Sequence, residues 1–236
     1  MGVDAARLRP PPGRLYGRTR SHRPSSRQLL LLGEVLPRCR FRAAAAIDPA
    51  VAFAARPREL WLEVGSGSGE HALAAIAAEP GIGLIACEVF ENGIASMLST
   101  LVRRGEEAAP RLPGNFRIWD ADARELIGLL PEASIRRLFL MFPDPWPKAR
   151  HAKRRFVHPA NVAAVARVLA PGAEWRIATD DAVHQAWVVE VLAGQDFFSA
   201  TAPAEARPAG WWPTRYEAKA RAAGRRILYW RAVRRC

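Results

Sequence analysis

Residues 60–70 read Leu60-Trp61-Leu62-Glu63-Val64-Gly65-Ser66-Gly67-Ser68-Gly69-Glu70. The first five residues form an apolar run interrupted only by Glu63, which is typical of a strand buried on both faces of a sheet. Three glycines follow in the spacing G-x-G-x-G, and residues 70–78 have the composition of a helix. This strand, glycine turn and helix predict the first unit of an α/β fold.

The same alternation of strand-like and helix-like segments continues along the chain. We expect further strands near residues 84–89, 115–120, 137–142 and 174–179, and helices near residues 28–36, 92–104, 123–130, 159–169 and 182–193. Two late strands, 197–201 and 227–233, flank a Pro-rich, Trp-containing loop. The pattern predicts a mostly parallel seven-stranded sheet with helices on both faces and an antiparallel hairpin at its C-terminal edge.

The positive charge is concentrated at the two ends of the chain. The 236 residues carry a formal charge of +12, and residues 1–42 contain ten arginines against two acids. Residues 56–135 contain twelve acids against seven arginines, whereas residues 215–235 contain eight basic residues against one acid. We therefore expect a basic flexible arm over residues 1–27, a single domain over residues 28–236, basic ends suited to a polyanion and an acidic middle suited to a small cation.

Several classes of protein are disfavoured by the composition. No apolar stretch is long enough to span a bilayer, and the Arg-rich start resembles an organellar transit peptide only weakly. The cysteines and histidines are scattered without metal-ligand spacing, which predicts a cytoplasmic protein without a metal: Cys39, Cys87, Cys236, His22, His71, His151, His158 and His184.

The glycine turn predicts a pocket for a ligand that lacks phosphate. A dinucleotide fingerprint would have a third glycine where this chain has Glu70, and an acid there would face a pyrophosphate. S-adenosylmethionine contains no phosphate and fits better. Glu88, after the second strand, is placed for the ribose hydroxyls and Asp122, after the third, for the adenine amino group, although Asp120 is an alternative to Asp122. Glu63 is either a ligand or a buried carboxylate that orients the turn.

A second motif follows the fourth strand. Residues 143–156 read Pro143-Asp144-Pro145-Trp146-Pro147-Lys148-Ala149-Arg150-His151-Ala152-Lys153-Arg154-Arg155-Phe156. Three prolines stiffen the turn around Asp144 and Trp146, and a basic stretch without acids comes next. We interpret this as a reacting carboxylate beside a phosphate-binding strip formed by Arg150, Lys153, Arg154 and Arg155. Trp146 either stacks on a base or packs the turn against the sheet.

Five segments together resemble the bacterial tRNA (guanine-N7-)-methyltransferases: residues 62–70, 87–89, 144–155, 178–180 and 214–217. The likeness extends from about Tyr16 to Arg234, and the block around Asp144 is its most specific part. The resemblance implies a Rossmann-like class I methyltransferase domain that transfers a methyl group from S-adenosylmethionine to N7 of guanine-46 in the variable loop of tRNA. It implies no preference between a monomer and a homodimer.

The resemblance also assigns roles to individual positions. The cofactor site would be lined by Glu63, Gly65, Gly67, Glu88, Asp122 and Asp144, with Asp144 also catalytic. The substrate would be contacted by Lys148, Asp180, Thr214, Arg215, Tyr216 and Glu217. The family frequently has Lys where this chain has Arg215, which keeps the charge but changes its geometry.

Guanine N7 carries an in-plane lone pair and no proton, so it can attack a sulfonium methyl group without a strong general base. The enzyme must supply alignment and a negative environment for the base that becomes cationic, which Asp144 and Asp180 would provide. Two alternatives stay open at this point. One is an exocyclic-amine methyltransferase, which usually reads Asp-Pro-Pro-aromatic, and the other is a non-catalytic RNA-binding protein of the same fold.

Overall fold

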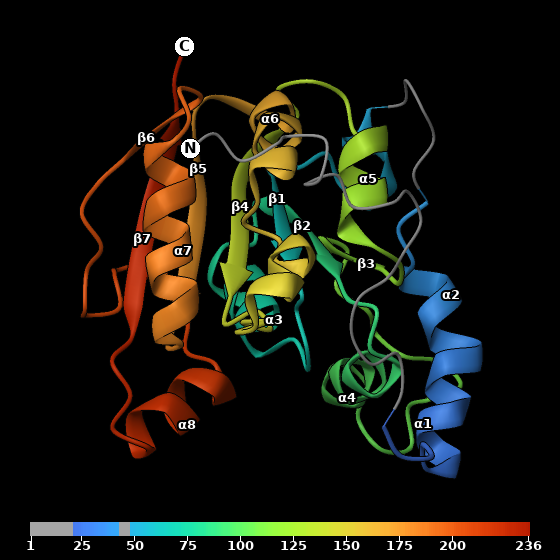
Figure 1. Cartoon of the computed structure of the whole chain (residues 1–236). Helices are drawn as coiled ribbons and strands as arrows, with labels where there is room; N and C mark the ends of the chain where they lie inside the picture. Colours follow the sequence, from blue (N-terminus) through green and yellow to red (C-terminus); the bar gives the residue numbers. More distant parts are fainter. Residues whose placement is uncertain (1–20, 43–47) are drawn as a thin grey trace.

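The computed structural model describes residues 21–42 and 48–236. Within them, seven strands form one sheet in the order β3-β2-β1-β4-β5-β7-β6 (Figure 1). The strands are β1 (Glu59–Val64), β2 (Ile82–Cys87), β3 (Phe116–Trp119), β4 (Ile135–Met141), β5 (Leu169–Thr179), β6 (Phe198–Ala200) and β7 (Leu228–Arg234). Strands β1 to β5 pair in parallel, and β7 lies antiparallel between β5 and β6. The predicted mixed sheet is confirmed. Its last strand in the sequence, β7, is not at the edge of the sheet, because β6 lies outside it.

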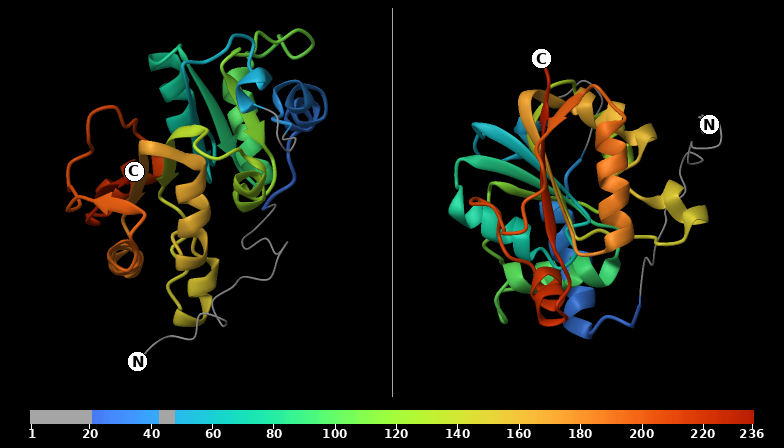
Figure 2. Two further views of the ribbon diagram at one scale, coloured as in Figure 1. Left: turned by 90° about the horizontal axis from the view of Figure 1, so that it is seen from above. Right: turned by 60° about the vertical axis from the view of Figure 1, so that its left-hand side comes forward.

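The helices cover both faces of the sheet (Figures 1 and 2). They are α1 (Ser26–Leu30), α2 (Leu36–Cys39), α3 (Glu70–Ala78), α4 (Glu91–Leu101), α5 (Ala123–Leu129), α6 (Pro159–Val168), α7 (Ala182–Ala193) and α8 (Arg215–Ala222). Three further segments are helical as well: η2 (Leu31–Val35), η3 (Pro49–Ala52) and η4 (Ala149–Arg154). The sequence predicted neither η4 nor α8.

Alternating strand residues divide the core into two halves. Leu60, Leu62 and Val64 of β1 face a cluster that contains the buried sides of α5, α6 and α7. Trp61 faces the opposite cluster, where the N-terminal helices, α3 and α4 pack and where α8 contributes Ala220. Because both faces are covered, β1 reads as a nearly continuous apolar run, and Glu63 becomes the exception that needs a partner.

The register of the sheet brings the polar strand ends together. Val64 at the end of β1 pairs with Cys87 of β2, and Cys87 pairs with Trp119 of β3. On the other side, Val64 pairs with Leu140 of β4, and Met141 of β4 pairs with Ala178 of β5. The segments after these strands therefore emerge along one edge, which is where open α/β sheets place their ligands.

Part of the predicted N-terminal arm is docked onto α4. The Ser21 N–H donates to Asn92 Oδ1 at 2.9 Å, and Asn92 Nδ2 donates to the His22 carbonyl at 3.0 Å. Arg27 donates to Glu107 and to the Val102 carbonyl, both at 2.6 Å. Residues 21–27 are thus held in place, and the rest of the predicted arm, including Tyr16, lies outside the described residues.

No helix in residues 21–42 and 48–236 is long and apolar enough to cross a membrane.

Candidate cofactor and substrate cleft

The glycine turn is shaped by three left-handed backbone conformations. Gly65, Gly67 and Gly69 have φ angles of +72°, +56° and +80°, which glycine adopts at little cost. The N–H groups of Gly65 and Ser66 donate to the Cys87 carbonyl at 2.9 and 3.0 Å, which ties the turn to the end of β2. The turn therefore presents backbone rather than side chains to the cleft.

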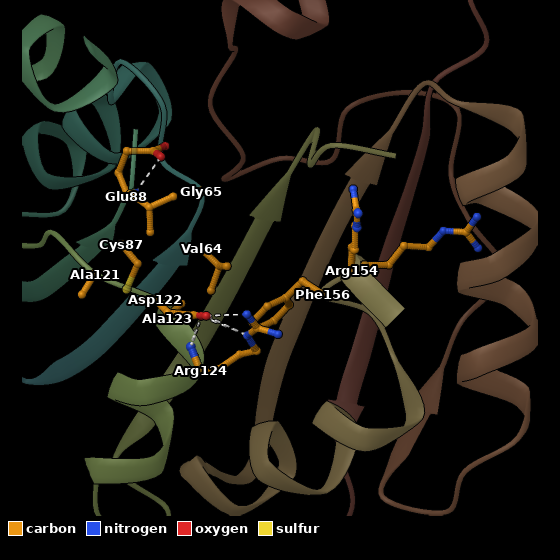
Figure 3. Close-up of a pocket in the computed structure, with 12 residues that line it drawn as sticks. Val64, Gly65, Cys87, Glu88, Ala121, Asp122, Ala123, Arg124, Arg154 and Phe156 are labelled. Carbon is orange, nitrogen blue, oxygen red and sulfur yellow. Dashed lines mark hydrogen bonds and ion pairs between the residues drawn. The ribbon is translucent and has the colours of Figure 1, made fainter. Parts of the chain in front are cut away.

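Glu88 connects this turn to the start of α4. Its carboxylate accepts from the N–H groups of Gly67 at 2.6 Å and of Val89 and Phe90 at 2.8 Å. Burial raises the pKa of Glu88, the three N–H donors oppose that shift, and the charge of Asp144 adds to it. The carboxylate is held in one orientation and borders the pocket shown in Figure 3.

Gly93 in the first turn of α4 allows that helix to approach the glycine turn. A Cβ atom at this position would lie 2.9 Å from the Gly67 carbonyl oxygen and 3.4 Å from Glu88 Cγ. Sequence reasoning did not select this residue. A glycine inside a helix is unfavourable by roughly 0.5–1 kcal/mol, and this local cost was the signal for a close backbone approach.

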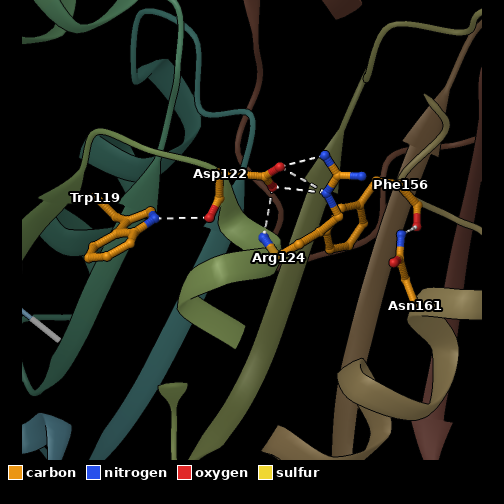
Figure 4. A network of polar contacts seen from close by, with 5 residues as sticks. All are labelled: Trp119, Asp122, Arg124, Phe156 and Asn161. Atoms are coloured by element: carbon orange, nitrogen blue, oxygen red, sulfur yellow. Dashed lines mark hydrogen bonds and ion pairs between the residues drawn. The ribbon is translucent and has the colours of Figure 1, made fainter. Parts of the chain in front are cut away.

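The structure separates the two aspartates after β3. Asp122 lines the same pocket as Gly65 and Glu88, and it also caps α5 by accepting from the Arg124 N–H at 2.9 Å (Figures 3 and 4). The Arg124 guanidinium forms an ion pair with the same carboxylate. Asp120 instead forms an ion pair with Arg40 at 2.7 Å. Of the two, only Asp122 lines the pocket beside Glu88.

Glu63 is a buried carboxylate, as one of its two expected roles requires, and its partner lies on α3. Its side chain is 2% exposed, and its Oε2 lies 2.7 Å from Nδ1 of the buried His71 on α3. The His71 ring in turn packs against Phe139 and Trp212, with ring centroids 4.6 and 5.4 Å away. A direct contact between Glu63 and a ligand stays a prediction, whereas its link between β1 and α3 is visible.

A larger cavity of about 650 Å³ lies beside the pocket. Asp144, Asp180 and Tyr216 line it, and Asp180 Oδ2 accepts from Arg225 Nε at 2.6 Å. Tyr216 of α8 also reaches the glycine turn, because a Cβ at Gly67 would lie 3.8 Å from its ring. The pocket and the cavity therefore approach each other where Gly67, whose N–H donates to Glu88 of the pocket, meets Tyr216 of the cavity.

The basic stretch after Asp144 divides into exposed and buried members. Lys148, Arg150 and Lys153 are exposed on or beside η4, and the Arg154 guanidinium lies 4.7 Å from the centroid of the Trp146 ring. Arg155 is only 5% exposed, which does not favour its assignment to the phosphate strip. Its side chain turns inward, and Nε and Nη2 donate to backbone carbonyls of the turn.

The structure shows the protein neighbours of Trp146, whereas stacking of its ring on a base stays a prediction. The ring is half-buried between Arg154 and the edge of His151, whose ring centroid is 5.8 Å away.

The segment 214–217 begins α8. Thr214 Oγ1 accepts from the Glu217 N–H at 3.0 Å as the helix N-cap. The Glu217 carboxylate is 2% exposed and contacts Arg207 at 3.0 Å and Arg221 at 2.9 Å. Both of its oxygens are thus paired within the protein, and a contact of Glu217 with the substrate stays a prediction. Arg215 stays near the cleft, with Nε 3.6 Å from Glu70 Oε1.

The Thr-x-x-Glu spacing is a known signature of a helix N-terminus, and it was the overlooked signal for α8. Among the described residues, no group of three or more His, Cys, Asp and Glu side chains is placed to hold a metal ion.

Comparisons with known proteins identify the family of the chain. A family model described as a putative methyltransferase matches residues 57–230. The chain is 57% identical over 226 residues to the tRNA (guanine-N(7)-)-methyltransferase of Granulibacter bethesdensis, covering 95% of this chain and 96% of that protein. It is 42% identical to the protein of the same name from Paramagnetospirillum magneticum, covering 92% and 90% of the two chains.

Solved structures share the fold at low identity. The crystal structure of the 16S rRNA methyltransferase KamB aligns with a TM-score of 0.54 at 14% identity, covering 76% of this chain and 89% of that chain. A 16S rRNA (adenine(1408)-N(1))-methyltransferase aligns with a TM-score of 0.52, also at 14% identity, covering 76% and 87%. These likenesses confirm the Rossmann-like methyltransferase fold, and the family match together with the relatives shows that the chain belongs to the tRNA (guanine-N7-)-methyltransferases.

Proposed function

We propose that the protein transfers a methyl group from S-adenosylmethionine to N7 of a guanine in tRNA, at guanine-46 of the variable loop. The observation that carries this proposal is that Glu88 and Asp122 border one pocket while Asp144 and Asp180 border a neighbouring cavity. The names of the most similar relatives support the same reaction.

The residues of the smaller pocket suit S-adenosylmethionine. Glu88 is a fixed acceptor for a ribose diol, because three backbone N–H groups hold its carboxylate. Gly65 and Gly67 leave room for an amino acid group beside the turn, and Asp122 would accept from an adenine amino group. When bound, the cofactor supplies an electrophilic methyl group on a sulfonium.

Asp122 must exchange partners in that arrangement. Both of its carboxylate oxygens accept from Arg124 in the described structure, so an adenine amino group would share or displace the guanidinium.

Asp144 and Asp180 would provide the environment for the reacting base. Guanine N7 needs no proton removed, so the carboxylates act as acceptors for the base edge and as negative charges near a ring that becomes cationic. Asp144 lines the cavity and lies close enough to Glu88 to add to the rise in the pKa of that group, which supports a position near the pocket. We therefore assign Asp144 the catalytic position and Asp180 a supporting one.

The exposed side chains of Lys148, Arg150 and Lys153 and the half-buried Arg154 would hold tRNA phosphates, and Arg215 and Tyr216 would contact the substrate from α8. A cytoplasmic location and a monomeric or dimeric state stay predictions.

The test is methylation of unmodified tRNA with S-adenosylmethionine, with the modified nucleoside identified by mass and its position mapped by cleavage at N7-methylguanosine. The proposal predicts N7-methylguanosine at position 46. Methylated adenine or an exocyclic methylguanine would contradict it, and so would binding of tRNA without any transfer. Asp144→Ala is the matched variant: it should abolish transfer while leaving tRNA affinity largely unchanged, because the basic strip is intact.

A further inference from the structure

We propose that Arg155 is a positioning residue that holds the Asp144 turn in its reactive conformation from inside the protein. This inference rests on the proposed function, because it concerns the geometry of the carboxylate that faces the acceptor base. It assigns the last basic residue of the stretch a role different from that of its exposed neighbours.

The Asp144 turn is strained on both sides of the carboxylate. Phe142 and Trp146 have φ angles of +53° and +44°, which are unfavourable for residues with a Cβ atom. The Phe142 N–H donates to the Ala178 carbonyl at 2.8 Å, so neighbouring β5 holds the first strained residue. The second needs another constraint, and prolines flanking Trp146 have no N–H to supply one.

Arg155 supplies that constraint through the backbone. Its Nε donates to the Pro145 carbonyl at 3.1 Å, and its Nη2 donates to the Trp146 carbonyl at 2.9 Å. The planar guanidinium thus spans two consecutive carbonyls directly after Asp144. A lysine ammonium keeps the charge but cannot present the same rigid pair of donors.

The surroundings of Arg155 are built around a buried cation. The guanidinium lies 4.9 Å from the centroid of the Trp187 ring on α7, a favourable distance for a cation–π contact. The buried rings of His158 and His184 lie near the same charge, and burial together with Arg155 lowers the pKa of both histidines. Arg155 therefore carries the positive charge of this cluster, while its neighbours stay neutral.

Two adjacent arginines therefore contact the same residue. Arg155 Nη2 donates to the Trp146 carbonyl, and the half-buried Arg154 lies over the Trp146 ring. The basic stretch is in this way connected to the catalytic turn through one tryptophan.

The test compares Arg155→Met and Arg155→Lys with Arg150→Met, which removes the same charge from an exposed position of the stretch. Three quantities are measured for each purified protein: the single-turnover methylation rate at saturating tRNA, the tRNA affinity at several salt concentrations, and the ¹⁹F NMR signal of Trp146 after 5-fluorotryptophan labelling. The Trp146 signal is assigned with Trp146→Phe, and circular dichroism reports whether each variant folds.

We expect Arg155→Met to lower the single-turnover rate by about 100-fold, because small displacements of a catalytic group have effects of that size. Arg155→Lys should lower the rate nearly as much. Because this variant keeps the charge, it still tests the proposal if the methionine variant does not fold. Both should shift or broaden the Trp146 signal and leave the salt dependence of tRNA binding unchanged. Arg150→Met should weaken tRNA binding, reduce the salt slope by about one and leave the Trp146 signal in place.

An unchanged Trp146 signal in both Arg155 variants would overturn the proposal, as would a parental single-turnover rate in Arg155→Lys. A reduced salt slope in Arg155→Met equal to that of Arg150→Met would return Arg155 to the phosphate strip. A parent protein that makes no N7-methylguanosine would instead overturn the proposed function, while the Trp146 signal would still test whether Arg155 holds the turn.

Discussion

Gly93→Ala should weaken S-adenosylmethionine binding although residue 93 carries no side chain that could contact the cofactor. The added methyl group would lie 2.9 Å from the Gly67 carbonyl oxygen and must move by about half an ångström to reach the 3.4 Å of an ordinary contact. Because the obstacle is backbone, relief requires that α4 or the glycine turn shifts. Either shift lengthens the 2.6 Å hydrogen bond from the Gly67 N–H to Glu88.

Overpacking of this kind costs about 1–3 kcal/mol. If the strain is released by displacing the turn from its binding conformation, the dissociation constant of S-adenosylmethionine rises by roughly 5- to 150-fold, since 1.4 kcal/mol is about tenfold. The assay is isothermal titration calorimetry of the purified protein, with thermal unfolding measured in parallel.

Gly128→Ala in α5 is the matched control, because it makes the same substitution in a helix where a Cβ would meet no atom within 4 Å. It should leave the dissociation constant unchanged and raise the unfolding free energy by roughly 0.5–1 kcal/mol. A Gly93→Ala protein that binds S-adenosylmethionine as tightly as the parent would refute the reasoning, as would an equal loss of affinity in both variants.

Three further predictions concern other carboxylates and one buried histidine. Asp122→Asn should weaken S-adenosylmethionine binding by about tenfold, whereas Asp120→Asn should leave it unchanged; calorimetry that ranks them in reverse order would place the adenine elsewhere. Glu217→Gln should lower the free energy of unfolding by about 1–3 kcal/mol, because two arginines lose a shared buried acceptor, and parental stability in urea would contradict that role. Burial lowers the pKa of His184 from the usual 6.5 of histidine to about 4, so its contribution to stability is complete above pH 6.5 and is lost as the pH falls to 4. The parent should therefore lose roughly 3 kcal/mol more than His184→Gln between pH 7 and pH 4, and parallel pH profiles in urea unfolding would show that the histidine does not titrate in this range.

The α/β fold was predictable because its signals are local and repeated. The glycine turn after β1 and the alternation of apolar segments determine a parallel sheet, and α3 and α7 have the predicted bounds of residues 70–78 and 182–193. The insertion of β7 between β5 and β6 was not visible, since hydrophobic alternation identifies a strand without identifying its neighbours.

α8 was missed for a different reason. Residues 215–222 are highly charged and follow a Pro-rich segment, so hydrophobic periodicity gives little indication of a helix there. The Thr214 cap and the buried Glu217, which pairs with two arginines, provide the stabilisation that an apolar face usually provides.

The order of the strands predicts which acidic residues lie at the site. It does not distinguish residues of the same charge that are close together in the sequence. Asp120 and Asp122 are two residues apart after the same strand, yet Asp120 pairs with Arg40, whereas Asp122 caps α5 and lines the pocket beside Glu88. Arg154 and Arg155 are adjacent in a uniformly basic stretch, yet one lies over the Trp146 ring and the other is buried beneath the turn. Such differences depend on tertiary contacts that a single sequence does not contain.

The most direct test of the proposed cleft is a crystal structure of the protein with S-adenosylhomocysteine and guanosine. The proposal predicts the ribose hydroxyls within hydrogen-bond distance of Glu88, the sulfur atom directed at the cavity of Asp144, and guanine N7 in line with it. A cofactor product bound away from Gly65 and Gly67, or a guanine on the opposite side of Tyr216 from Asp144, would contradict the central claim.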